Sequence, residues 1–418
     1  MKILFLNPGA ELGGAERSLL FLIESLRSAR PHWLVELIAG AHGPLLERAR
    51  CLGATASVCE FPPSLARLGD SGSRAQASPM LAMAGGIGRA ALPSLAYLYG
   101  LRRAIERAAP DVIHSNGFKM HIMAAYARMP GCRLVWHVRD FVSARPAMSR
   151  LMRAHSNRAA LAIANSASIA DDLRSVCGDG LRIATVHNAV DLERYRPDGI
   201  AADLDALAAM PAAAPKVVKI GMVATMARWK GQPVFLRAIK EVAKFVPLRA
   251  YVVGGPIYQR DASQFSLSEL KRLAADLGIS EIVGFTGQVV DTAQVMRALD
   301  IVVHASVEPE PFGLVVAEAM ACGRATVVAG AGGVMEIVTP GADALVHRPG
   351  DAADLANTIV RLALDSDLAR RLGAAARLAA ERRFSRDRMT AQILPLYERL
   401  AVGQAVESGD TAAGSARA

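Results

Sequence analysis

Two glutamates separated by seven residues form the most informative chemical pattern in the sequence. Glu310 lies in the segment EPEPFG, and Glu318 lies in the run LVVAEAMACG that follows it. The apolar neighbours of Glu318 predict a buried helix, in which a charged residue is unusual, and this weakens the alternative of a solvated helix face. Eight residues of ideal helix, from a start at Pro311 to an end at Gly323, separate the carboxylates by about 12 Å. The pair therefore suits the two ends of a long ligand rather than one reacting atom.

Glycine pairs follow apolar runs at two other places. Gly332 and Gly333 end the loop GAGG that comes directly after the run ATVVA, and Gly13 and Gly14 follow the run KILFLN. A backbone without Cβ atoms can approach a ligand closely, and a helix that begins there offers N–H groups to an anion. The loop in the second half is a candidate cradle for a diphosphate. For Gly13 and Gly14, an ordinary strand–helix turn is an equally good interpretation.

Two cations follow another apolar run, and a histidine lies at the end of a further one. Arg228 and Lys230 belong to RWKGQ after KIGMVA, and His137 ends RLVWHV. Side chains at the carboxyl ends of parallel strands lie where ligands bind, and cations there can neutralise phosphate. An extended stretch would project Arg228 and Lys230 to the same side. Solvated surface for the cations and a structural role for the histidine are the alternatives.

The elements that must position these residues alternate along the chain. Amphipathic segments separate the short apolar runs, and this pattern predicts parallel sheets with helices on both faces. The runs are VELIAG, DVIHSN, RLVWHV, LAIANS and IATVHN in the first half, and KIGMVA, RAYVVGG, EIVGFTG, DIVVHAS, ATVVAG and ALVHRP in the second. Two Rossmann-like halves with a cleft between them are expected.

The boundaries follow from composition. We predict an N-terminal domain over 1–197, a proline-containing linker over 198–215 and a C-terminal domain over 216–375. Helices over 376–401 are expected to pack back toward the N-terminal domain, and the small polar tail 402–418 is expected to be disordered.

Composition narrows the class of protein. Of the 418 residues, 52% are hydrophobic and 21% charged, which excludes a disordered chain. Five cysteines without a CxxC pair argue against a zinc site or a disulfide framework and favour a reducing cytosol. The net charge is +9, and seven arginines lie within 128–158. They suit an anionic membrane or a phosphorylated substrate, whereas no nucleic-acid-binding motif accompanies them.

One apolar segment raises the question of a membrane. Residues 78–101 are the best candidate, but Arg89 and Pro93 interrupt them. A charge at that position is costly in a bilayer, so we predict no transmembrane span. A segment lying on a membrane surface is compatible with the pattern.

Together, the motifs resemble the family-four retaining glycosyltransferases, which share the GT-B fold. The resemblance extends over nearly the whole chain, through GGAER, WHVRDF, ANS, HNAVDLERY, WKGQ, VVGG, VGFTGQV, the E-x7-E block and GAGG. It implies an α/β protein of GT-B type, with two Rossmann-like domains whose parallel sheets face each other across a cleft. It also implies transfer of a sugar from a nucleotide-sugar donor to a glycan or lipid-linked acceptor in cell-surface polysaccharide or glycolipid biosynthesis.

The resemblance assigns roles to the residues of the second half. Glu318 would bind the ribose hydroxyls of the donor, Glu310 the donor sugar and Lys230 the diphosphate. The loop after Gly287 would hold the base. Backbone near the sugar and phosphate would come from Phe312, Gly313, Gly332 and Gly333.

In the first half, the resemblance implies that Gly13 and Gly14 close over the donor. His137 would lie near the donor sugar and the acceptor. Members of the family need no metal, and no cofactor is expected beyond the sugar nucleotide, which is a substrate. Front-face attack, in which the leaving phosphate takes the acceptor proton, would explain the absence of an obvious general base. A cytoplasmic protein, peripheral at the inner face of the cytoplasmic membrane, is expected.

The sequence departs from the family pattern at Thr225, where an arginine is usual. We expect Arg228 to replace that cation. Two alternatives to a glycosyltransferase stay open: another sugar-nucleotide enzyme on the same fold, such as an epimerase, and a non-catalytic sugar-nucleotide binder of a polysaccharide assembly.

Overall fold

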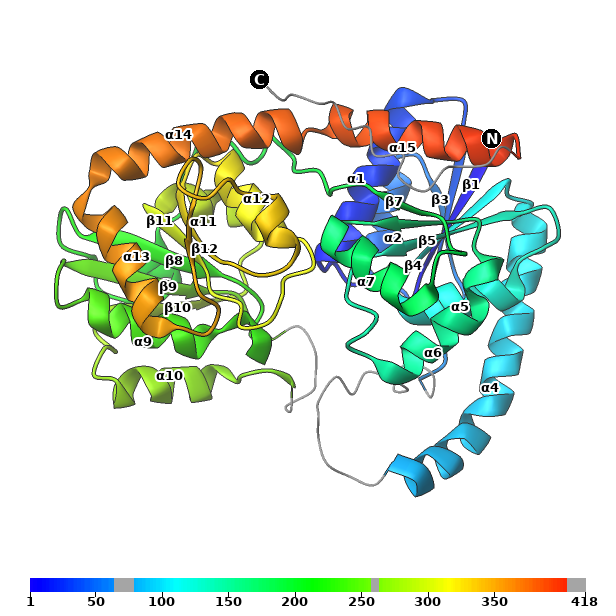
Figure 1. Ribbon diagram of the computed structural model, residues 1–418, viewed down its shortest axis with the longest axis horizontal. Helices are drawn as coiled ribbons and strands as arrows, with labels where there is room; N and C mark the ends of the chain where they lie inside the picture. Colours follow the sequence, from blue (N-terminus) through cyan, green and yellow to red (C-terminus); the bar gives the residue numbers. More distant parts are fainter. Residues whose placement is uncertain (64–78, 257–262, 404–418) are drawn as a thin grey trace. The chain divides into compact units, whose positions relative to one another are not determined.

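The computed structural model describes residues 1–63, 79–256 and 263–403, with side chains of the middle range described from residue 92 onward. The chain divides into two compact units, Met1–Ala189 with Arg386–Ala418, and Val190–Ser385. Each unit contains a parallel sheet with helices on both faces, as Figure 1 shows. The predicted α/β class with two Rossmann-like domains is confirmed.

The first unit contains a seven-stranded sheet in the order β3-β2-β1-β4-β5-β6-β7. All of its strand pairs are parallel. The chain starts in the middle of the sheet, builds outward to β3, and crosses back to β4, so that β1 and β4 flank a switch point. The strands are β1 (Lys2–Asn7), β2 (Leu34–Ala39), β3 (Thr55–Val58), β4 (Val112–Asn116), β5 (Arg133–Val138), β6 (Leu161–Ala164) and β7 (Ile183–Thr185).

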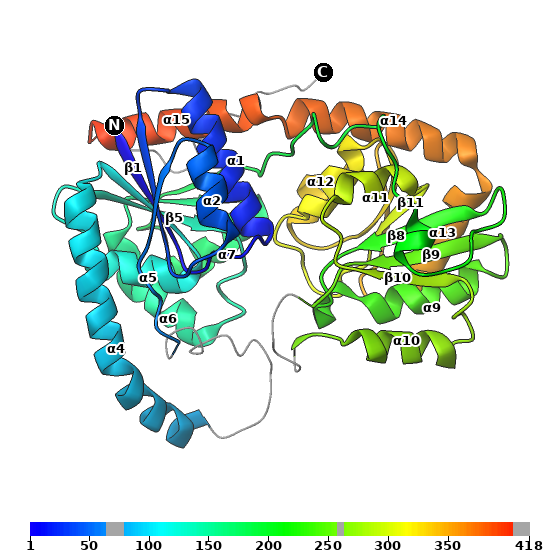
Figure 2. The same cartoon turned by 180° about the vertical axis from the view of Figure 1, so that it is seen from behind.

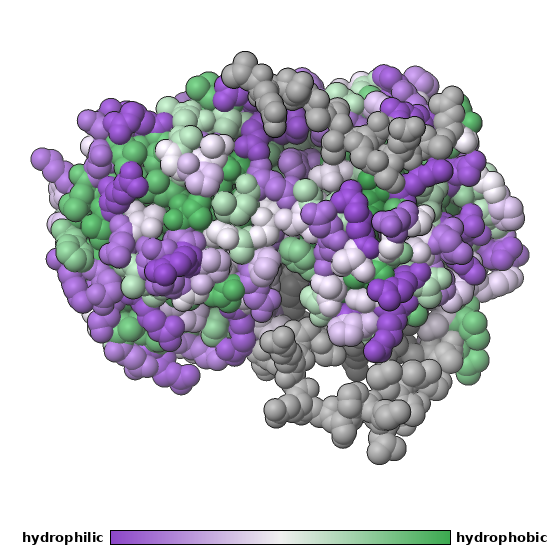
Figure 3. Space-filling view, viewed as in Figure 1, coloured by the Kyte–Doolittle hydropathy of each residue, from purple (hydrophilic) through white to green (hydrophobic). Residues whose placement is uncertain are grey.

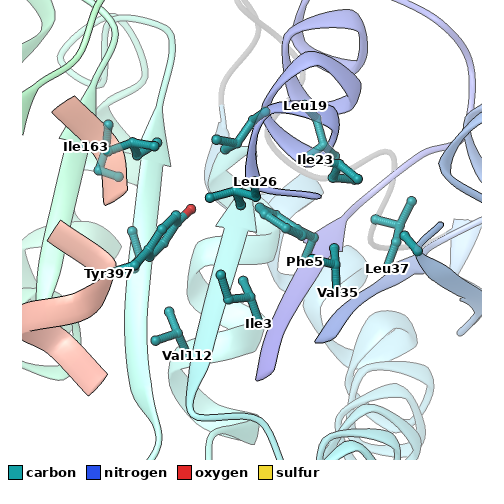
Figure 4. Packing of buried hydrophobic residues seen from close by; sticks show 14 of the residues in the cluster. Ile3, Phe5, Leu19, Ile23, Leu26, Val35, Leu37, Val112, Ile163 and Tyr397 are labelled. Carbon is teal, nitrogen blue, oxygen red and sulfur yellow. The ribbon is translucent and has the colours of Figure 1, made fainter. Parts of the chain in front are cut away.

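Helices bury both faces of this sheet. Helices α1, α2 and α15 lie on one face, and α4, α5, α6 and α7 lie on the other (Figures 1 and 2). Figure 4 shows the apolar cluster on the first of these faces, in which Tyr397 lies among Ile3, Val112 and Ile163. The helices are α1 (Gly14–Ala29), α2 (Pro44–Cys51), α4 (Pro79–Ala108), α5 (Phe118–Ala127), α6 (Pro146–His155), α7 (Ala167–Cys177) and α15 (Arg386–Ala401).

The second unit contains a six-stranded parallel sheet in the order β10-β9-β8-β11-β12-β13. Its switch point lies between β8 and β11. The strands are β8 (Val218–Val223), β9 (Leu248–Val253), β10 (Val283–Gly287), β11 (Ile301–His304), β12 (Ala325–Ala329) and β13 (Leu345–His347). The helices are α8 (Leu204–Leu207), α9 (Gln232–Val242), α10 (Leu267–Asp276), α11 (Thr292–Ala298), α12 (Leu314–Ala321), α13 (Ala352–Leu364) and α14 (Ser366–Arg383).

The contacts of residues 198–215 differ from those expected of a linker. Asp205, which is buried, accepts a hydrogen bond from the hydroxyl of Tyr251 at 2.8 Å and lies 3.7 Å from the guanidinium of Arg249. These contacts anchor the segment to β9, within the second unit. The chain returns to the first unit at Arg386, so α14 belongs to the second unit and α15 to the first.

The segment predicted to lie near a membrane forms most of α4. Within the described residues, no helix is long and apolar enough to cross a bilayer. The tail predicted to be disordered lies outside the described residues from position 404 onward.

Candidate active site

The second unit brings chemically active side chains together at its switch point. The chain leaves β8 through a loop and a single 3₁₀ turn, Arg228–Lys230, and the adjacent strand β11 ends at His304. Gly231 allows this arrangement, because its φ is +81° and a Cβ atom there would lie 2.0 Å from the carbonyl oxygen of Ala305. The carboxyl ends of neighbouring strands around a switch point are where ligands bind in such sheets.

Glu310 is the centre of this cluster. Its two carboxylate oxygens accept hydrogen bonds from the Nζ atom of Lys230 at 2.9 and 2.8 Å. The Nε2 atom of His304 and the Oγ atom of Ser306 each lie 3.0 Å from the Oε2 atom. Since a carboxylate only accepts, both groups donate to it.

Glu310 is only 7% exposed. Burial by itself raises the pKa of its carboxyl group, but the charge of Lys230 and the hydrogen bond from His304 outweigh burial and hold that pKa well below its usual range. The side chain is therefore an anion at every physiological pH. It can accept hydrogen bonds and stabilise positive charge, but it cannot act as a general acid.

The glycine loop after β12 supports the main chain of Glu310. Glu310 and Gly332 form a parallel bridge, the N–H of Glu310 donates to the carbonyl oxygen of Ala331 at 3.1 Å, and the N–H of Gly333 donates to the carbonyl oxygen of Glu310 at 2.7 Å. One expectation changes here. The loop leads into a 3₁₀ turn, Gly333–Glu336, rather than an α-helix, and the N–H of Gly333 serves the protein itself. The loop therefore positions the main chain of Glu310.

Helix α12 begins later than predicted. Its N-cap is Gly313, with a φ of +95°, and its first residue is Leu314 rather than Pro311. The helical spacing calculated between Glu310 and Glu318 is therefore wrong, since Glu310 precedes the helix. Phe312 is buried in the core and packs edge-on against Phe384, with ring centroids 6.0 Å apart, so its side chain anchors the loop.

Glu318 lies in a second polar cluster of the same unit. It is partly exposed on α12, and burial together with its negative charge raises the pKa of Tyr195. The hydroxyl of Tyr195 also pairs with the Oγ1 atom of Thr292 at 2.7 Å, and Arg194 forms an ion pair with Asp291 at 3.2 Å. The carboxylate thus lies near the 288–292 loop that was predicted to hold the base.

Arg228 does not lie beside Lys230 as predicted. The segment is a 3₁₀ turn rather than extended chain, so residues two apart diverge. The guanidinium of Arg228 forms an ion pair with Glu269 at 3.2 Å and lies over the ring of Phe265, 4.5 Å from its centroid. The expectation that both cations project to the same side is wrong for this reason.

Gly13, Gly14 and His137 lie in the first unit. Gly13 caps α1 with extended backbone, and its N–H donates to the Oε2 atom of Glu16 at 3.1 Å. That N–H is therefore engaged by the protein. His137 lies at the carboxyl end of β5, is 5% exposed, and has an Nε2 atom without a partner in the described structure.

Several residues around these positions carried no role in the sequence interpretation. They are His304 and Ser306 beside Glu310, Arg194 and Tyr195 near Glu318, and His114, Arg139, Asn188 and Tyr397 around His137. Polar residues at the end of the run DIVVHAS were a usable signal for His304 and Ser306. Tyr397 had none, because it reaches His114 from 283 residues further along the chain.

Comparison with known proteins places this architecture in a class. Residues 12–194 match the family model Glycosyltransferase Family 4, and residues 217–365 match the model Glycosyl transferases group 1. The fold is that of the GT-B glycosyltransferases. The chain belongs to the GT-B glycosyltransferases.

Curated relatives match over part of their length. A D-inositol 3-phosphate glycosyltransferase of Nocardia farcinica is 37% identical over 221 residues, which are 50% of this chain and 46% of the relative. One of Streptomyces bingchenggensis is 32% identical over 244 residues, 56% of this chain and 52% of the relative. The match therefore spans about half the length of these relatives.

Solved structures match over nearly the whole chain. HepE of Anabaena in complex with UDP has a TM-score of 0.74 and 27% identity, covering 95% of this chain and 100% of HepE. HepE in complex with UDP-glucose has a TM-score of 0.74 and 26% identity, covering 95% and 99%. The sucrose-phosphate synthase of Thermosynechococcus elongatus, at 20% identity and a TM-score of 0.74, shares the fold, with 97% and 100% covered.

Proposed function

We propose that this protein is a retaining glycosyltransferase that uses a uridine diphosphate sugar as its donor. The observation that carries the proposal is the partly buried contact of Lys230 with both oxygens of Glu310, at the carboxyl ends of β8 and β11. A cation and a permanent anion held this way suit a substrate with a diphosphate at one end and sugar hydroxyls at the other. HepE, which was solved with UDP and with UDP-glucose, supports this donor class.

The cluster supplies two kinds of stabilisation to such a reaction. The ammonium group of Lys230 can donate a hydrogen bond to the diphosphate, which gains negative charge as the sugar bond breaks. Glu310 stays in place meanwhile, because His304 and Ser306 also donate to it. Glu310 can accept a hydrogen bond from a sugar hydroxyl and lies ready to stabilise positive charge on the sugar. The acceptor oxygen is proposed to bond to the anomeric carbon on the face from which the diphosphate leaves, while the leaving phosphate takes the proton of the acceptor hydroxyl. Attack on that face retains the anomeric configuration.

The proposal is tested with a panel of UDP-, GDP- and ADP-sugars. Release of the nucleoside diphosphate is measured with and without candidate acceptors, and ¹H NMR gives the anomeric configuration of the product. We expect UDP release that depends on acceptor and a product with the configuration of the donor. Epimerised UDP-sugar without UDP release would support the epimerase alternative, and binding without turnover would support the non-catalytic binder.

Metal independence belongs to the same proposal. Among the described residues, no group of three His, Cys, Asp or Glu side chains could hold a metal ion. Transfer is expected to continue in excess EDTA, because Lys230 supplies charge to the diphosphate. Loss of activity in EDTA that magnesium or manganese restores would contradict this part.

We also propose that the acceptor is a glycan or lipid-linked saccharide met at an anionic membrane surface. The observation that favours it is an apolar stripe on α4, where Leu92, Leu95 and Tyr99 follow helical spacing and are 78%, 63% and 63% exposed. In Figure 3, hydrophobic side chains gather at the edge of the first unit where α4 runs. Arg103 lies over the ring of Tyr99, 5.4 Å from its centroid, so a cation borders the stripe.

The seven arginines of 128–158 contribute unevenly to such a surface. Arg139 is partly buried in the first unit, where Asn188 and His137 engage it, and Arg145 forms an ion pair with Asp140 at 2.8 Å. Arg150 and Arg153 are exposed on α6. Each cation near an anionic membrane contributes about 1 kcal/mol.

Flotation with vesicles of anionic lipid tests the membrane proposal. Wild type is expected to bind at low salt and to dissociate as salt rises. The triple variant Leu92→Ser, Leu95→Ser, Tyr99→Ser is expected to lose binding. The control Leu364→Ser removes one comparably exposed leucine, 65% exposed, from the second unit and is expected to bind normally. Wild type that fails to float at low salt would contradict the proposal.

A further inference from the structure

A chain of buried hydrogen bonds joins the C-terminal helix α15 to His137. The hydroxyl of Tyr397 lies 2.6 Å from the Nδ1 atom of His114, and the Nε2 atom of His114 lies 3.0 Å from the Nδ1 atom of His137. Arg139 approaches the same Nδ1 atom at 3.2 Å and is itself held by the Oδ1 atom of Asn188 at 2.6 Å. Tyr397 and His114 are completely buried, and Figure 4 shows Tyr397 within the apolar cluster under α15.

The donor and acceptor roles along this chain follow from elementary rules. A guanidinium has donors and no acceptor, so the Nδ1 atom of His137 must accept from Arg139. His114 must then carry a proton on Nε2, because two lone pairs facing each other would repel. A neutral His114 with its proton on Nε2 has a lone pair on Nδ1, which accepts from the hydroxyl of Tyr397. A neutral His137 must carry its own proton on Nε2.

The charges of the surrounding groups agree with this assignment. Burial, the cation of Arg139 and the neighbouring histidines hold the pKa of His137 well below its usual range. Burial and Arg139 have the same effect on the pKa of His114. Burial lowers the pKa of Arg139 only to about 10, so the guanidinium stays charged, and burial raises the pKa of Tyr397, so its hydroxyl stays a donor.

We propose that Tyr397 and His114 are positioning residues that fix the tautomer of His137, so that His137 presents an Nε2–H donor at the carboxyl end of β5. The Nε2 atom of His137 has no partner in the described structure, although it is buried. A buried N–H without a partner is costly and calls for an acceptor. Under the proposed function, on which this inference rests, that acceptor is a hydroxyl oxygen of the donor sugar or of the acceptor.

A fixed Nε2–H tautomer changes the chemistry available to His137. The ring then has no lone pair toward a substrate, since its only lone pair, on Nδ1, is engaged by His114 and Arg139. His137 therefore orients a hydroxyl by donating to it and does not remove a proton. This agrees with the proposal that the leaving phosphate takes the proton of the acceptor.

The tautomer can be measured without any substrate. Full-length protein with ¹⁵N-labelled histidine is recorded between pH 5.5 and pH 8.5, and the signals of His137 are identified by their loss in His137→Gln. We expect a proton on Nε2, a bare Nδ1, and no titration in that range. The groups that face the ring, directly or through Arg139, are His114, His121, Arg139, Tyr397 and Glu16. A proton on Nδ1, or titration within that range, overturns the proposal.

Two pairs of variants separate positioning from structural support. Tyr397→Phe removes the hydroxyl that donates to His114 and is expected to give mixed tautomers at His137. It should lower kcat about tenfold, as loss of an outer partner of a functional histidine commonly does, with little change in the KM for donor. The control Tyr97→Phe removes another buried hydroxyl of the same unit, which lies 3.7 Å from the sulfur of Met120. It should leave the tautomer of His137 and kcat unchanged.

The second pair replaces His114. His114→Gln keeps an N–H that can donate to the Nδ1 atom of His137 and should retain most activity, whereas His114→Leu should lose it about tenfold. Equal kcat values in Tyr397→Phe and Tyr97→Phe overturn the proposal. A wild type without transferase activity but with the expected tautomer contradicts the proposed function and supports the assignment of protons, so the two failures are distinguishable.

Discussion

The main chains of Glu310 and Gly332 are in such close contact that only glycine fits at position 332. A Cβ atom on Gly332 would lie 2.5 Å from the carbonyl oxygen and 2.8 Å from the nitrogen of Glu310, and the φ angle of Gly332 is +79°. The glycine loop after β12 thus fixes the position of the Glu310 main chain, from which the side chain extends. The position of the carboxylate depends on this contact as much as on its own hydrogen bonds.

Gly332→Ala is the direct test of that relationship. The added methyl group should displace the Glu310 loop and lower kcat/KM at least tenfold. Gly341→Ala is a matched control, because Gly341 has a φ of +78° and nothing within 4 Å of its ideal Cβ position. Both variants carry the backbone strain of an alanine at positive φ, but only Gly332→Ala brings a methyl group against the main chain of Glu310. Equal activities in the two variants would refute the role of the contact.

Glu310 should make the folded protein less stable as the pH falls into the acid range. Its pKa in the folded protein is lower than in the unfolded chain, so it contributes stability above the unfolded pKa, and this contribution is lost as pH falls toward the folded pKa. With an unfolded pKa of about 4.3, wild type should lose about 1 kcal/mol between pH 6 and pH 3.5 that Glu310→Gln does not lose. Urea unfolding at both pH values measures this, and a constant difference between the two proteins would contradict it.

Glu318 is expected to act mainly on donor binding. Loss of a hydrogen bond from ribose to a carboxylate should raise the KM for donor about tenfold or more in Glu318→Ala, with a smaller change in kcat. Tyr195→Phe is the companion variant, because Glu318 also lies near that hydroxyl. If Tyr195→Phe reproduced the whole effect, Glu318 would act by holding Tyr195 and not by binding the ribose.

Replacing Lys230 and replacing Arg228 should have very different effects on activity and stability. Lys230→Ala leaves Glu310 as a buried anion without its cation, so both activity and stability should fall, the latter by about 3–5 kcal/mol. Arg228→Ala removes a solvent-screened surface ion pair with Glu269, so its effect on stability should be small. We expect kcat to change less than threefold in Arg228→Ala. A large fall in kcat with unchanged donor KM would restore Arg228 as the replacement for the cation missing at Thr225.

The strands that position the site could be predicted because each one is a short apolar run ended by turn residues. Strand β3 was not predicted, since the residues of Thr55–Val58 are at best half-buried at the edge of the sheet and carry little apolar signal. The E-x7-E block and the glycine loop were found from residue types and spacing alone. Their arrangement was not, because the bridge between Glu310 and Gly332 joins two loops and delays the start of α12.

Contacts between distant segments explain the remaining differences. The turn at Arg228–Lys230 is shaped by Gly231, which packs on Ala305 of another loop, and no local pattern in RWKGQ indicates it. His137 contacts His114 of β4, and His114 in turn contacts Tyr397 of α15. The pattern of the apolar run that contains His114 does not indicate this contact. Sequence reasoning located the reactive residues, whereas their partners depend on the tertiary fold.

Donor turnover by Glu310→Gln tests the central claim most directly. The rate of UDP release from the preferred UDP-sugar is compared between wild type, Glu310→Gln and Glu308→Gln, whose target is an exposed glutamate of the same loop. If the buried anion beside Lys230 stabilises the transferring sugar, Glu310→Gln should lower kcat about 10²–10³-fold while Glu308→Gln stays near wild type. Turnover by Glu310→Gln equal to that of wild type would contradict the account.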